Sequence, residues 1–406
     1  MWIAPPPTPL FEVTMIFTFD SSQVGAPVLS GSAGALRAVI KACLVDGFGA
    51  GPVASITVAA GVATVAFSGS HPYRVGSVIQ IAGATPAALN GNKRTSTVVG
   101  SSITFPAPGV PDGAATGTIT AKMAPAGWVE LFPGALANVL AVKPSATEAS
   151  GSVLRLDDTG TTTARVVGYE FLSAISTGDG AFPTEAQFPG GLYWPKSNVA
   201  STAARPWWVF ADERSFLIWT APHASYPTHG TLFGFGDVVS DKSGDAYCGA
   251  LFGGDFSVSS TSSQIVGCIG IASFGNTASH AYIARLHSGM GGAQLIKKGG
   301  PYNSGAAYSG TVSYGSTYGI PYPNGADNSL RLGPVDVFVG ASGIRGRVAG
   351  AYHTPQAVGE GFSTGGIVDG QGDYAGRSFV ALRVGPPGSA PSAAGTVFVD
   401  TTGPWR

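Results

Sequence analysis

Short runs in which apolar and polar residues alternate make up most of this chain. Glycine, proline, asparagine or aspartate separates one run from the next, which is typical of strands joined by tight turns. In the first third of the chain, the predicted strands cover residues 78–81, 97–99, 103–105 and 118–120. Strands do not alternate with helices, which disfavours a doubly wound fold. The pattern predicts a mainly β protein with sandwich-type or barrel-type domains.

Two segments predict β-hairpins. Residues 57–67 alternate on both sides of Ala60-Gly61, a dipeptide that suits a tight turn. Farther along, residues 207–210 and 216–219 form two apolar runs around the polar break Asp212-Glu213-Arg214. We expect that break to be the turn of a hairpin.

One segment departs from this alternation and predicts an amphipathic helix near the N-terminus. Its apolar residues recur at the spacing of one helical stripe, at Leu36, Val39, Ile40, Cys43 and Leu44. We expect Ser30 or Ser32 to cap the start of this helix, and Gly47 to follow its end. Cys43 lies on the stripe, so we interpret it as a small core residue and not as a reactive thiol.

Changes in composition divide the chain into four parts. Residues 1–19 form an N-terminal arm, and residues 231–406 form a glycine-rich C-terminal β domain. Residues 53–121 carry only four charged side chains, and segments rich in glycine, proline and alanine flank them. We expect them to be a small β domain inserted in a surface loop. Residues 20–52 plus 122–230 then form one split, β-rich core domain.

Residues 289–325 are rich in glycine, tyrosine, serine and asparagine, which indicates a long loop. Loops of this length are usually functional or are ordered by a partner. We therefore consider Tyr308, Tyr314 and Tyr318 candidate contacts to a partner protein or to a glycan.

Four tryptophans cluster in the middle of the chain, at Trp194, Trp207, Trp208 and Trp219. Trp207 and Trp208 are neighbours on a predicted strand, so their side chains point to opposite faces. We expect one of the two in the core and the other exposed or at an interface. An exposed tryptophan suits a subunit contact or a sugar-binding platform, which makes both residues candidate contacts.

Charge is scarce and balanced, with 22 basic and 23 acidic side chains among 406 residues and a net charge of −1. Charged residues make up 11 % of the chain, against roughly 25 % in an average soluble domain. This balance argues against general nucleic-acid binding. No apolar run is long enough for a membrane helix, so we expect no membrane insertion.

The cysteines and the N-terminus bear on where the chain is made. Three cysteines, far apart in the sequence, cannot build a disulfide framework and indicate a reducing compartment. The first residues lack the basic and apolar regions of a signal peptide. We therefore expect a chain that is not exported by the usual route.

Common catalytic and metal-binding motifs are missing from the sequence. It contains no nucleophile elbow, no phosphate-binding glycine loop, no H-E-x-x-H and no C-x-x-C. Two histidine pairs match no standard zinc spacing: His223 with His229, and His280 with His287. We interpret these four as strand-end or loop residues, and we expect no catalytic residue, metal or cofactor.

Three groups of acidic residues also fit a structural role better than a chemical one. Asp237, Asp241 and Asp245 recur at every fourth position without the spacing of a calcium loop, so we expect a solvated loop. Asp157-Asp158 and Asp212-Glu213 are adjacent pairs, whose side chains point apart on a strand and cannot flank one glycosidic bond. Calcium binding and glycan cleavage are the alternatives for these groups.

Short motifs spread over most of the chain outside residues 53–121 carry a resemblance. They are 25–34, 42–49, Gly127-Trp128, 154–158, Ala164-Arg165-Val166, Gly168-Tyr169-Glu170, Phe182-Pro183, Trp208, Phe210-Ala211-Asp212, Phe235-Gly236-Asp237, Ile344-Arg345-Gly346 and Gly403-Pro404-Trp405-Arg406. Together they resemble a family of uncharacterised virion proteins of tailed bacteriophages, which are structural parts encoded among tail genes.

The segment 53–121 carries a resemblance of its own. Its most distinctive residues are His71, Gly76, Val78, Ile81 and Gly83-Ala84. They resemble a small β domain that is inserted repeatedly into phage tail and fibre proteins. This second resemblance implies a location in the virion and no particular chemistry.

The resemblances imply a structural component of a phage tail, at the baseplate, tail-tip or fibre-attachment level. Such a protein is assembled in the host cytoplasm, and its expected partners are other virion tail proteins and further copies of itself. The family implies no active site, so no catalytic residue is carried over. The alternatives are a receptor-binding protein for host surface glycan, a head decoration protein and, as an enzyme, a polysaccharide depolymerase.

Overall fold

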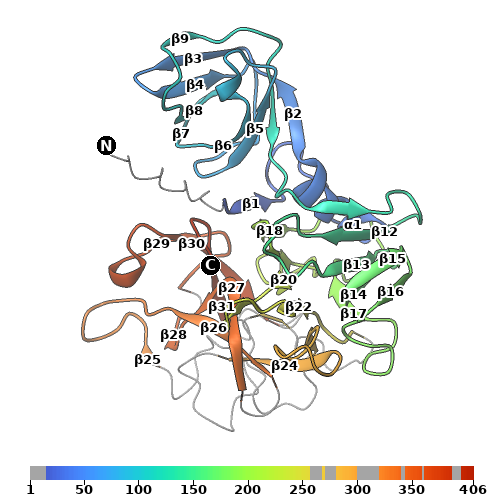
Figure 1. Cartoon of the computed structure of the whole chain (residues 1–406). Helices are drawn as coiled ribbons and strands as arrows, with labels where there is room; N and C mark the ends of the chain where they lie inside the picture. Colours follow the sequence, from blue (N-terminus) through green and yellow to red (C-terminus); the bar gives the residue numbers. More distant parts are fainter. Residues whose placement is uncertain are drawn as a thin grey trace, which may run out of the picture.

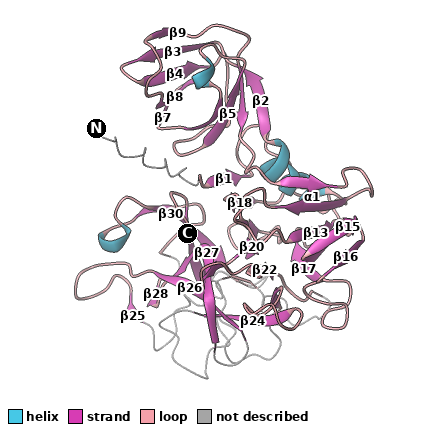
Figure 2. Cartoon of the chain, in the orientation of Figure 1, coloured by secondary structure: helices cyan, strands magenta, loops and turns pink. Residues whose placement is uncertain are grey.

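The computed structural model describes residues 15–256, 268–269, 280–299, 320–339, 343–358, 361–385 and 395–406. Strands dominate these residues, and the few helical segments are short, as Figure 2 shows. The predicted mainly β fold class is confirmed. Tyr308, Tyr314 and Tyr318 lie outside the described residues.

A curled antiparallel sheet of 13 strands forms the centre of the larger body (Figure 1). Its order is β1-β18-β19-β20-β22-β23-β24-β26-β27-β31-β30-β29, and β21 pairs with β27 beside this path. The bounds are β1 Phe17–Asp20, β18 Trp207–Ala211, β19 Ser215–Thr220, β20 Thr231–Asp237, β21 Val239–Ser240, β22 Gly249–Phe252, β23 Ala281–Ile283, β24 Gln294–Gly299, β26 Gly333–Val339, β27 Gly343–His353, β29 Ile367–Asp369, β30 Ser378–Val384 and β31 Gly395–Asp400. This order leaves β1 and β29 as the two edge strands.

Smaller sheets complete the larger body. They contain β11 Val129–Leu131, β12 Val139–Lys143, β13 Val153–Asp157, β14 Thr163–Tyr169 and β17 Leu192–Pro195 in one sheet, the hairpin β15 Phe171–Ala174 and β16 Thr177–Asp179, and the parallel pair β25 Ile320–Pro321 and β28 Gln356–Ala357. Trp194 of β17 is buried, and its indole donates a hydrogen bond to the carbonyl of Phe252 at 2.8 Å. This contact joins the five-stranded sheet to the central sheet.

Two sheets form a smaller lobe, drawn in blue to teal at the top of Figure 1. One contains β2 Phe48–Pro52, β10 Thr120–Met123, β5 Val78–Ala82 and β6 Gly91–Arg94; the other contains β7 Thr97–Val99, β8 Ser102–Pro106, β4 Val62–Ala66, β3 Ser55–Ala59 and β9 Gly113–Ala114. A single 3-10 turn, Ala87–Leu89, lies within this lobe. The entering strand β2 pairs antiparallel with the leaving strand β10, so that Pro52 lies opposite Thr120. Both connections to the larger body therefore lie side by side.

Polar contacts hold the smaller lobe against β1. The guanidinium of Arg74 pairs with the buried carboxylate of Asp20 at 2.5 Å. Arg94 donates to the carbonyl of Ile16 at 3.1 Å, and the Gln23 amide donates to the carbonyl of Pro72 at 3.3 Å. These contacts fix one side of the lobe on the edge strand of the central sheet.

The predicted helix forms, but its start differs from the prediction. Helix α1 spans Ala35–Lys41, and a π-helical turn, Ala42–Asp46, continues it. The five apolar residues of the predicted stripe are all buried, and Gly47 follows the end with a φ of 73°.

Neither Ser30 nor Ser32 caps this helix, which corrects the sequence-based expectation. The N-cap is Gly34, with a φ of 80° and no side-chain cap. The buried carboxylate of Asp158 instead accepts a hydrogen bond from the backbone N–H of Arg37 at 3.0 Å. A residue distant in the sequence thus accepts the hydrogen bond that the side chain of a local N-cap residue would otherwise accept.

Both predicted hairpins are confirmed. Strands β3 and β4 meet at Ala60 and Gly61, which have φ angles of 49° and 74°. Both values are positive, as a tight two-residue hairpin turn requires. Strands β18 and β19 pair around residues 212–214.

Two expectations about local structure differ from the structure. The strand predicted at 118–120 begins at Thr120 and runs to Met123. The expected loop at 289–325 contains the strand β24.

Candidate functional site: a buried polar network and its pocket

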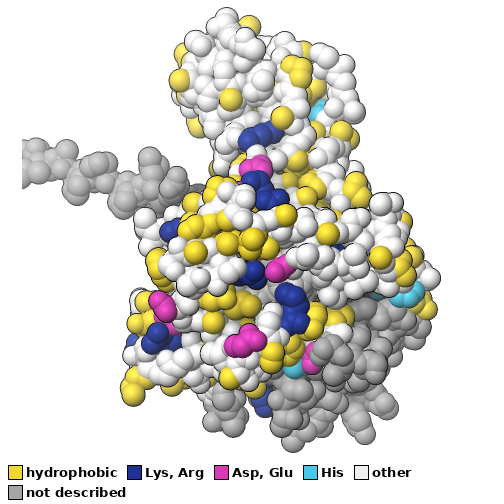
Figure 3. Space-filling view, turned by 90° about the vertical axis from the view of Figure 1, so that its right-hand side faces the viewer, with side chains coloured by type: hydrophobic (Ala, Val, Ile, Leu, Met, Phe, Trp, Pro, Cys, Tyr) yellow, Lys and Arg dark blue, Asp and Glu magenta, His cyan; other side chains and the backbone are white. Residues whose placement is uncertain are grey.

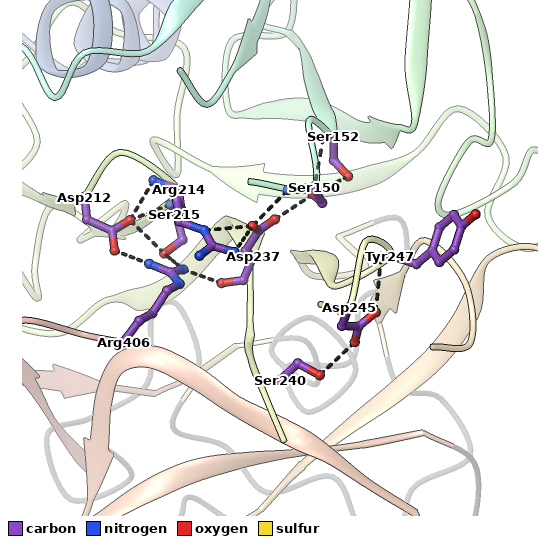
Figure 4. A network of polar contacts seen from close by, with 10 residues as sticks. All are labelled: Ser150, Ser152, Asp212, Arg214, Ser215, Asp237, Ser240, Asp245, Tyr247 and Arg406. Atoms are coloured by element: carbon purple, nitrogen blue, oxygen red, sulfur yellow. Dashed lines mark hydrogen bonds and ion pairs between the residues drawn. The ribbon is translucent and has the colours of Figure 1, made fainter. Parts of the chain in front are cut away.

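Charged side chains from distant segments meet beside the turn between β18 and β19 (Figure 4). The turn contributes Asp212 and Arg214, and β20 contributes Asp237 at its end. Arg406 donates to the carboxylate of Asp212 and to the backbone carbonyl of Asp237. The sheets around this turn bury mainly apolar side chains. Charged groups buried there lower stability unless each one is paired with an opposite charge and hydrogen-bonded.

Asp212 is completely buried, and both of its carboxylate oxygens accept hydrogen bonds. Its carboxylate accepts hydrogen bonds from the backbone N–H groups of Arg214 at 2.8 Å and Ser215 at 2.7 Å. The same carboxylate pairs with the guanidinium of Arg406. The indole of Trp128 donates to the backbone carbonyl of Asp212 at 2.9 Å. Side chain and backbone of this turn are therefore both held by distant residues.

Asp237 is the second buried carboxylate of the network. It accepts two hydrogen bonds from the Arg214 guanidinium, at 3.1 and 2.9 Å. Ser150 donates its backbone N–H at 3.0 Å and its hydroxyl at 2.6 Å. The carbonyl of Asp237 accepts from Arg406 at 2.6 Å. The two hydrogen bonds from Ser150 join the loop before β13, in the five-stranded sheet of the larger body, to β20.

A third ion pair lies at the other side of the network. Arg345 of β27 pairs with Asp245 at 2.8 Å, and both side chains are buried. The hydroxyl of Ser240 donates to Asp245 at 2.7 Å. A pocket of about 520 Å³ opens between the two ion-pair groups, and it is lined by residues that include Arg214, Asp245, Lys242, Cys248 and Arg406.

The three aspartates of this region are all strongly hydrogen-bonded. Asp212, Asp237 and Asp245 each accept several hydrogen bonds, whereas Glu148, which also lines the pocket, is exposed. The thiol of Cys248 has a pKa raised to about 12, first by burial and then by the nearby Asp237 and Asp245. A thiol with so high a pKa carries almost no thiolate at neutral pH. Among the described residues, no group of three or more His, Cys, Asp or Glu side chains could hold a metal ion.

Two of the three regularly spaced aspartates differ from the prediction of a solvated loop. Asp237 is a buried strand residue and Asp245 is a buried ion-pair partner, whereas only Asp241 is exposed. The fold pairs each buried carboxylate with an arginine far away in sequence, which spacing alone does not reveal.

The adjacent acids Asp157 and Asp158 also have separate environments. Asp158 is completely buried and pairs with the completely buried Lys196. Asp157 is partly exposed and pairs with Arg155 at 3.3 Å. The two carboxylates therefore serve different contacts.

The candidate histidines occupy unlike sites. His229 and His280 are buried, whereas His287 is exposed and His223 lies in a partly exposed loop. Burial lowers the pKa of His280, whose ring packs against Phe188 with the centroids 5.3 Å apart.

The candidate contact residues Trp207 and Trp208 divide as the strand geometry predicts. Trp207 is completely buried, and its indole donates to the carbonyl of Pro27 at 3.0 Å, so it offers no surface to a partner. Trp208 is half-buried and stacks on Phe210 with the ring centroids 5.8 Å apart. Gly365 packs closely over its ring. Only Trp208 of this pair remains a candidate contact.

Sequence reasoning missed Arg406, Arg214 and Ser150 as members of one network. Arg406 is 194 residues from Asp212, and Ser150 is 87 residues from Asp237. Neither spacing repeats a motif, so no local signal pointed to these contacts.

Comparisons with known proteins add no identification. No protein-family model matches the chain, and a search of curated proteins finds no similar sequence. In the described part of the chain, no helix has both the length and the apolar character that a membrane crossing demands.

Proposed function

We propose that the chain is a structural component of a bacteriophage tail, at the baseplate, tail-tip or fibre-attachment level. It acts by assembly with other virion tail proteins and with further copies of itself. The observation that carries this proposal is where the resemblance motifs lie. Five of their residues belong to the buried network or to its ion pairs: Trp128, Asp212, Asp237, Arg345 and Arg406. Motif residues that make buried structural contacts suit a protein whose folded shape provides its function.

The surface supports the same proposal. In the view of Figure 3, charged side chains gather in a few clusters in which basic and acidic residues lie near one another. Uncharged and hydrophobic side chains surround these clusters. Exposed apolar residues include Val75 (68 %), Val99 (75 %), Met290 (70 %) and Ile367 (73 %). Protein interfaces are depleted in charge at their centres and need apolar anchors. A surface of this composition favours assembly over a monomeric life in solution.

The receptor-binding alternative loses one of its supports. A sugar platform needs the exposed face of an aromatic ring, and Trp207 has none. Trp208 presents only part of its indole, because Phe210 and Gly365 pack against it. Assembly is therefore the function that the described surface favours.

Immunogold electron microscopy of purified virions, with an antibody to this chain, tests the proposal. We expect label only at the distal tail. Label over the whole capsid would overturn the tail assignment in favour of head decoration. Absence of label on virions, with the chain present in the infected lysate, would reject the structural class. Release of reducing ends from host polysaccharide by the purified chain would instead establish a depolymerase.

A further inference from the structure

Among the residues that the structure describes, the central sheet ends in a strand whose outer edge has no strand beside it. In the described part of the chain, β29 pairs only with β30, and Ile367 lies opposite Val380. The backbone hydrogen bonds that flank this pairing run from Ala381 N–H to the Gly366 carbonyl and from Gly370 N–H to the Arg377 carbonyl, each at 2.8 Å.

The alternation of an antiparallel pair then decides which backbone groups are free. Gly366 and Gly370 bond to β30, so Val368, midway between them, does so too. The N–H and C=O groups of Ile367 and Asp369 consequently point away from β30. A free edge of this kind is a template for another strand. Ile367 is also exposed, with 73 % of its surface accessible.

A groove of about 690 Å³ lies along β29. Its other wall is the segment 327–334, and residues 370–374 close one side. Its apolar residues include Leu330, Leu332, Val368, Tyr374 and Phe379. These side chains pack on the satellite core around Phe379 and Phe398, so the floor of the groove is fixed by the fold.

The charged residues of the groove are mostly acidic. Asp327, Asp369 and Asp373 line it, with Arg331 as the one cation, and Arg331 is already paired with Asp327 at 3.1 Å. Asp369 and Asp373 lie on exposed positions without an arginine or lysine partner in the described part of the chain. An edge with negative charge repels a second acidic edge and attracts a basic segment.

We propose that the β29 edge and this groove bind an extended segment of a partner protein in which apolar side chains alternate with lysine or arginine. The segment adds a strand to β29 through the backbone groups of Ile367 and Asp369. Its apolar side chains enter the groove, and its cations meet the acidic rim. Main-chain pairing supplies affinity, and the alternate side chains supply specificity. This site goes beyond the tail assignment and does not depend on it.

The probe is a fluorescein-labelled heptapeptide of alternating valine and lysine, compared with a matched peptide of valine and glutamate. Binding to the full-length chain is measured by fluorescence anisotropy at low ionic strength. We expect the lysine peptide to bind at least about tenfold more tightly than the glutamate peptide. Equal binding of the two peptides, or no binding of the lysine peptide, would overturn the proposal.

Two variants separate the edge from the charge. Ile367→Pro removes an outward N–H without breaking a bond to β30, and we expect about tenfold weaker binding of the lysine peptide. Ile367→Thr keeps that N–H and is the matched control for the backbone. Asp369→Asn with Asp373→Asn should weaken the lysine peptide selectively, whereas the exposed pair Asp46→Asn with Asp241→Asn should leave its affinity within about twofold.

Circular dichroism of each variant establishes that the fold is retained. Unchanged affinity in a folded Ile367→Pro variant would overturn strand addition. Analytical ultracentrifugation identifies the competing occupant: a wild-type dimer that Ile367→Pro dissociates would assign the edge to a second copy of this chain and reject a basic partner.

Discussion

The guanidinium of Arg406, the last residue of the chain, donates a hydrogen bond to the buried carboxylate of Asp212 in the β18–β19 turn. The same guanidinium reaches the hydroxyl of Ser215 at 2.8 Å and the carbonyl of Asp237 at 2.6 Å. Arg406 thus links the turn of the central hairpin to the end of β20. A residue outside the sheets thus completes a hydrogen-bond network in the middle of the fold.

Replacing Arg406 by alanine should lower the free energy of unfolding by about 2 kcal/mol. The carboxylate of Asp212 would stay buried and lose a charged donor, while its backbone donors remain. Urea unfolding followed by tryptophan fluorescence measures the change. Arg406→Lys, which keeps the charge and loses the forked geometry, should cost less. A loss under about 0.5 kcal/mol for Arg406→Ala would contradict this role of Arg406.

Replacing Lys196 by methionine should cost more, about 3–5 kcal/mol, because it leaves the completely buried Asp158 without its cation. The double variant Lys196→Met with Asp158→Asn removes both charges and keeps an acceptor for the N–H of Arg37. We expect it to recover part of the loss in the same urea titration. A double variant less stable than Lys196→Met alone would show that the buried charge is not the source of the cost.

Stability should decrease below neutral pH because His353 is buried. Burial lowers its pKa to about 4, partly offset by the backbone of Pro334, against about 6.5 in an unfolded chain. The unfolded chain therefore takes up the proton first, so the contribution of His353 is complete above pH 6.5 and is lost as the pH falls toward 4. Between pH 7 and pH 5 the loss should be about 2 kcal/mol.

The neutral variant His353→Gln isolates this effect from the titration of other groups. Its unfolding free energy, measured at pH 7 and pH 5, should change less than that of the wild type. Equal changes in the two proteins would exclude His353 as the group responsible.

The three thiols should be unreactive until the protein unfolds. Cys43, Cys248 and Cys268 are buried, and burial raises the pKa of each, to about 12 for Cys248 and Cys268. At pH 8 we expect no rapid reaction with Ellman's reagent, and reaction of all three thiols in guanidinium. Ser243→Cys, at an exposed position of the pocket, is the positive control. Rapid labelling of the native wild type would contradict the buried positions.

Excising the smaller lobe should leave the larger body folded. Pro52 and Thr120 are paired across β2 and β10, so an Asn-Gly turn joining them would close a hairpin. The carboxylate of Asp20 would lose Arg74, and Asp20→Asn in the same variant removes that cost. We expect one cooperative thermal transition close to that of the intact chain. An unfolded product would show that residues 53–119, which this variant lacks, are integral to the body and are not an insertion.

Local patterns predicted the elements well where neighbours along the chain decide them. The stripe from Leu36 to Leu44, the turn at Ala60-Gly61 and the hairpin around Asp212 all depend on residues close in sequence. The prediction that a serine caps the helix was wrong because a tertiary contact from Asp158 takes that place. The prediction of a solvated loop was wrong for Asp237 and Asp245 because their arginine partners lie elsewhere in the chain.

The sequence by itself determined the mainly β architecture, the short helix near the N-terminus and the opposite faces of Trp207 and Trp208, because side-chain periodicity is a local property of the backbone. Only the tertiary structure decided which carboxylates are buried, which strand forms the free edge and where the guanidinium of Arg406 lies. Those features depend on pairings between separate segments, such as Asp212 with Arg406, which are 194 residues apart, and Asp245 with Arg345, which are 100 residues apart. Such pairings are fixed by mutual burial and charge neutralisation, which no short window of sequence contains.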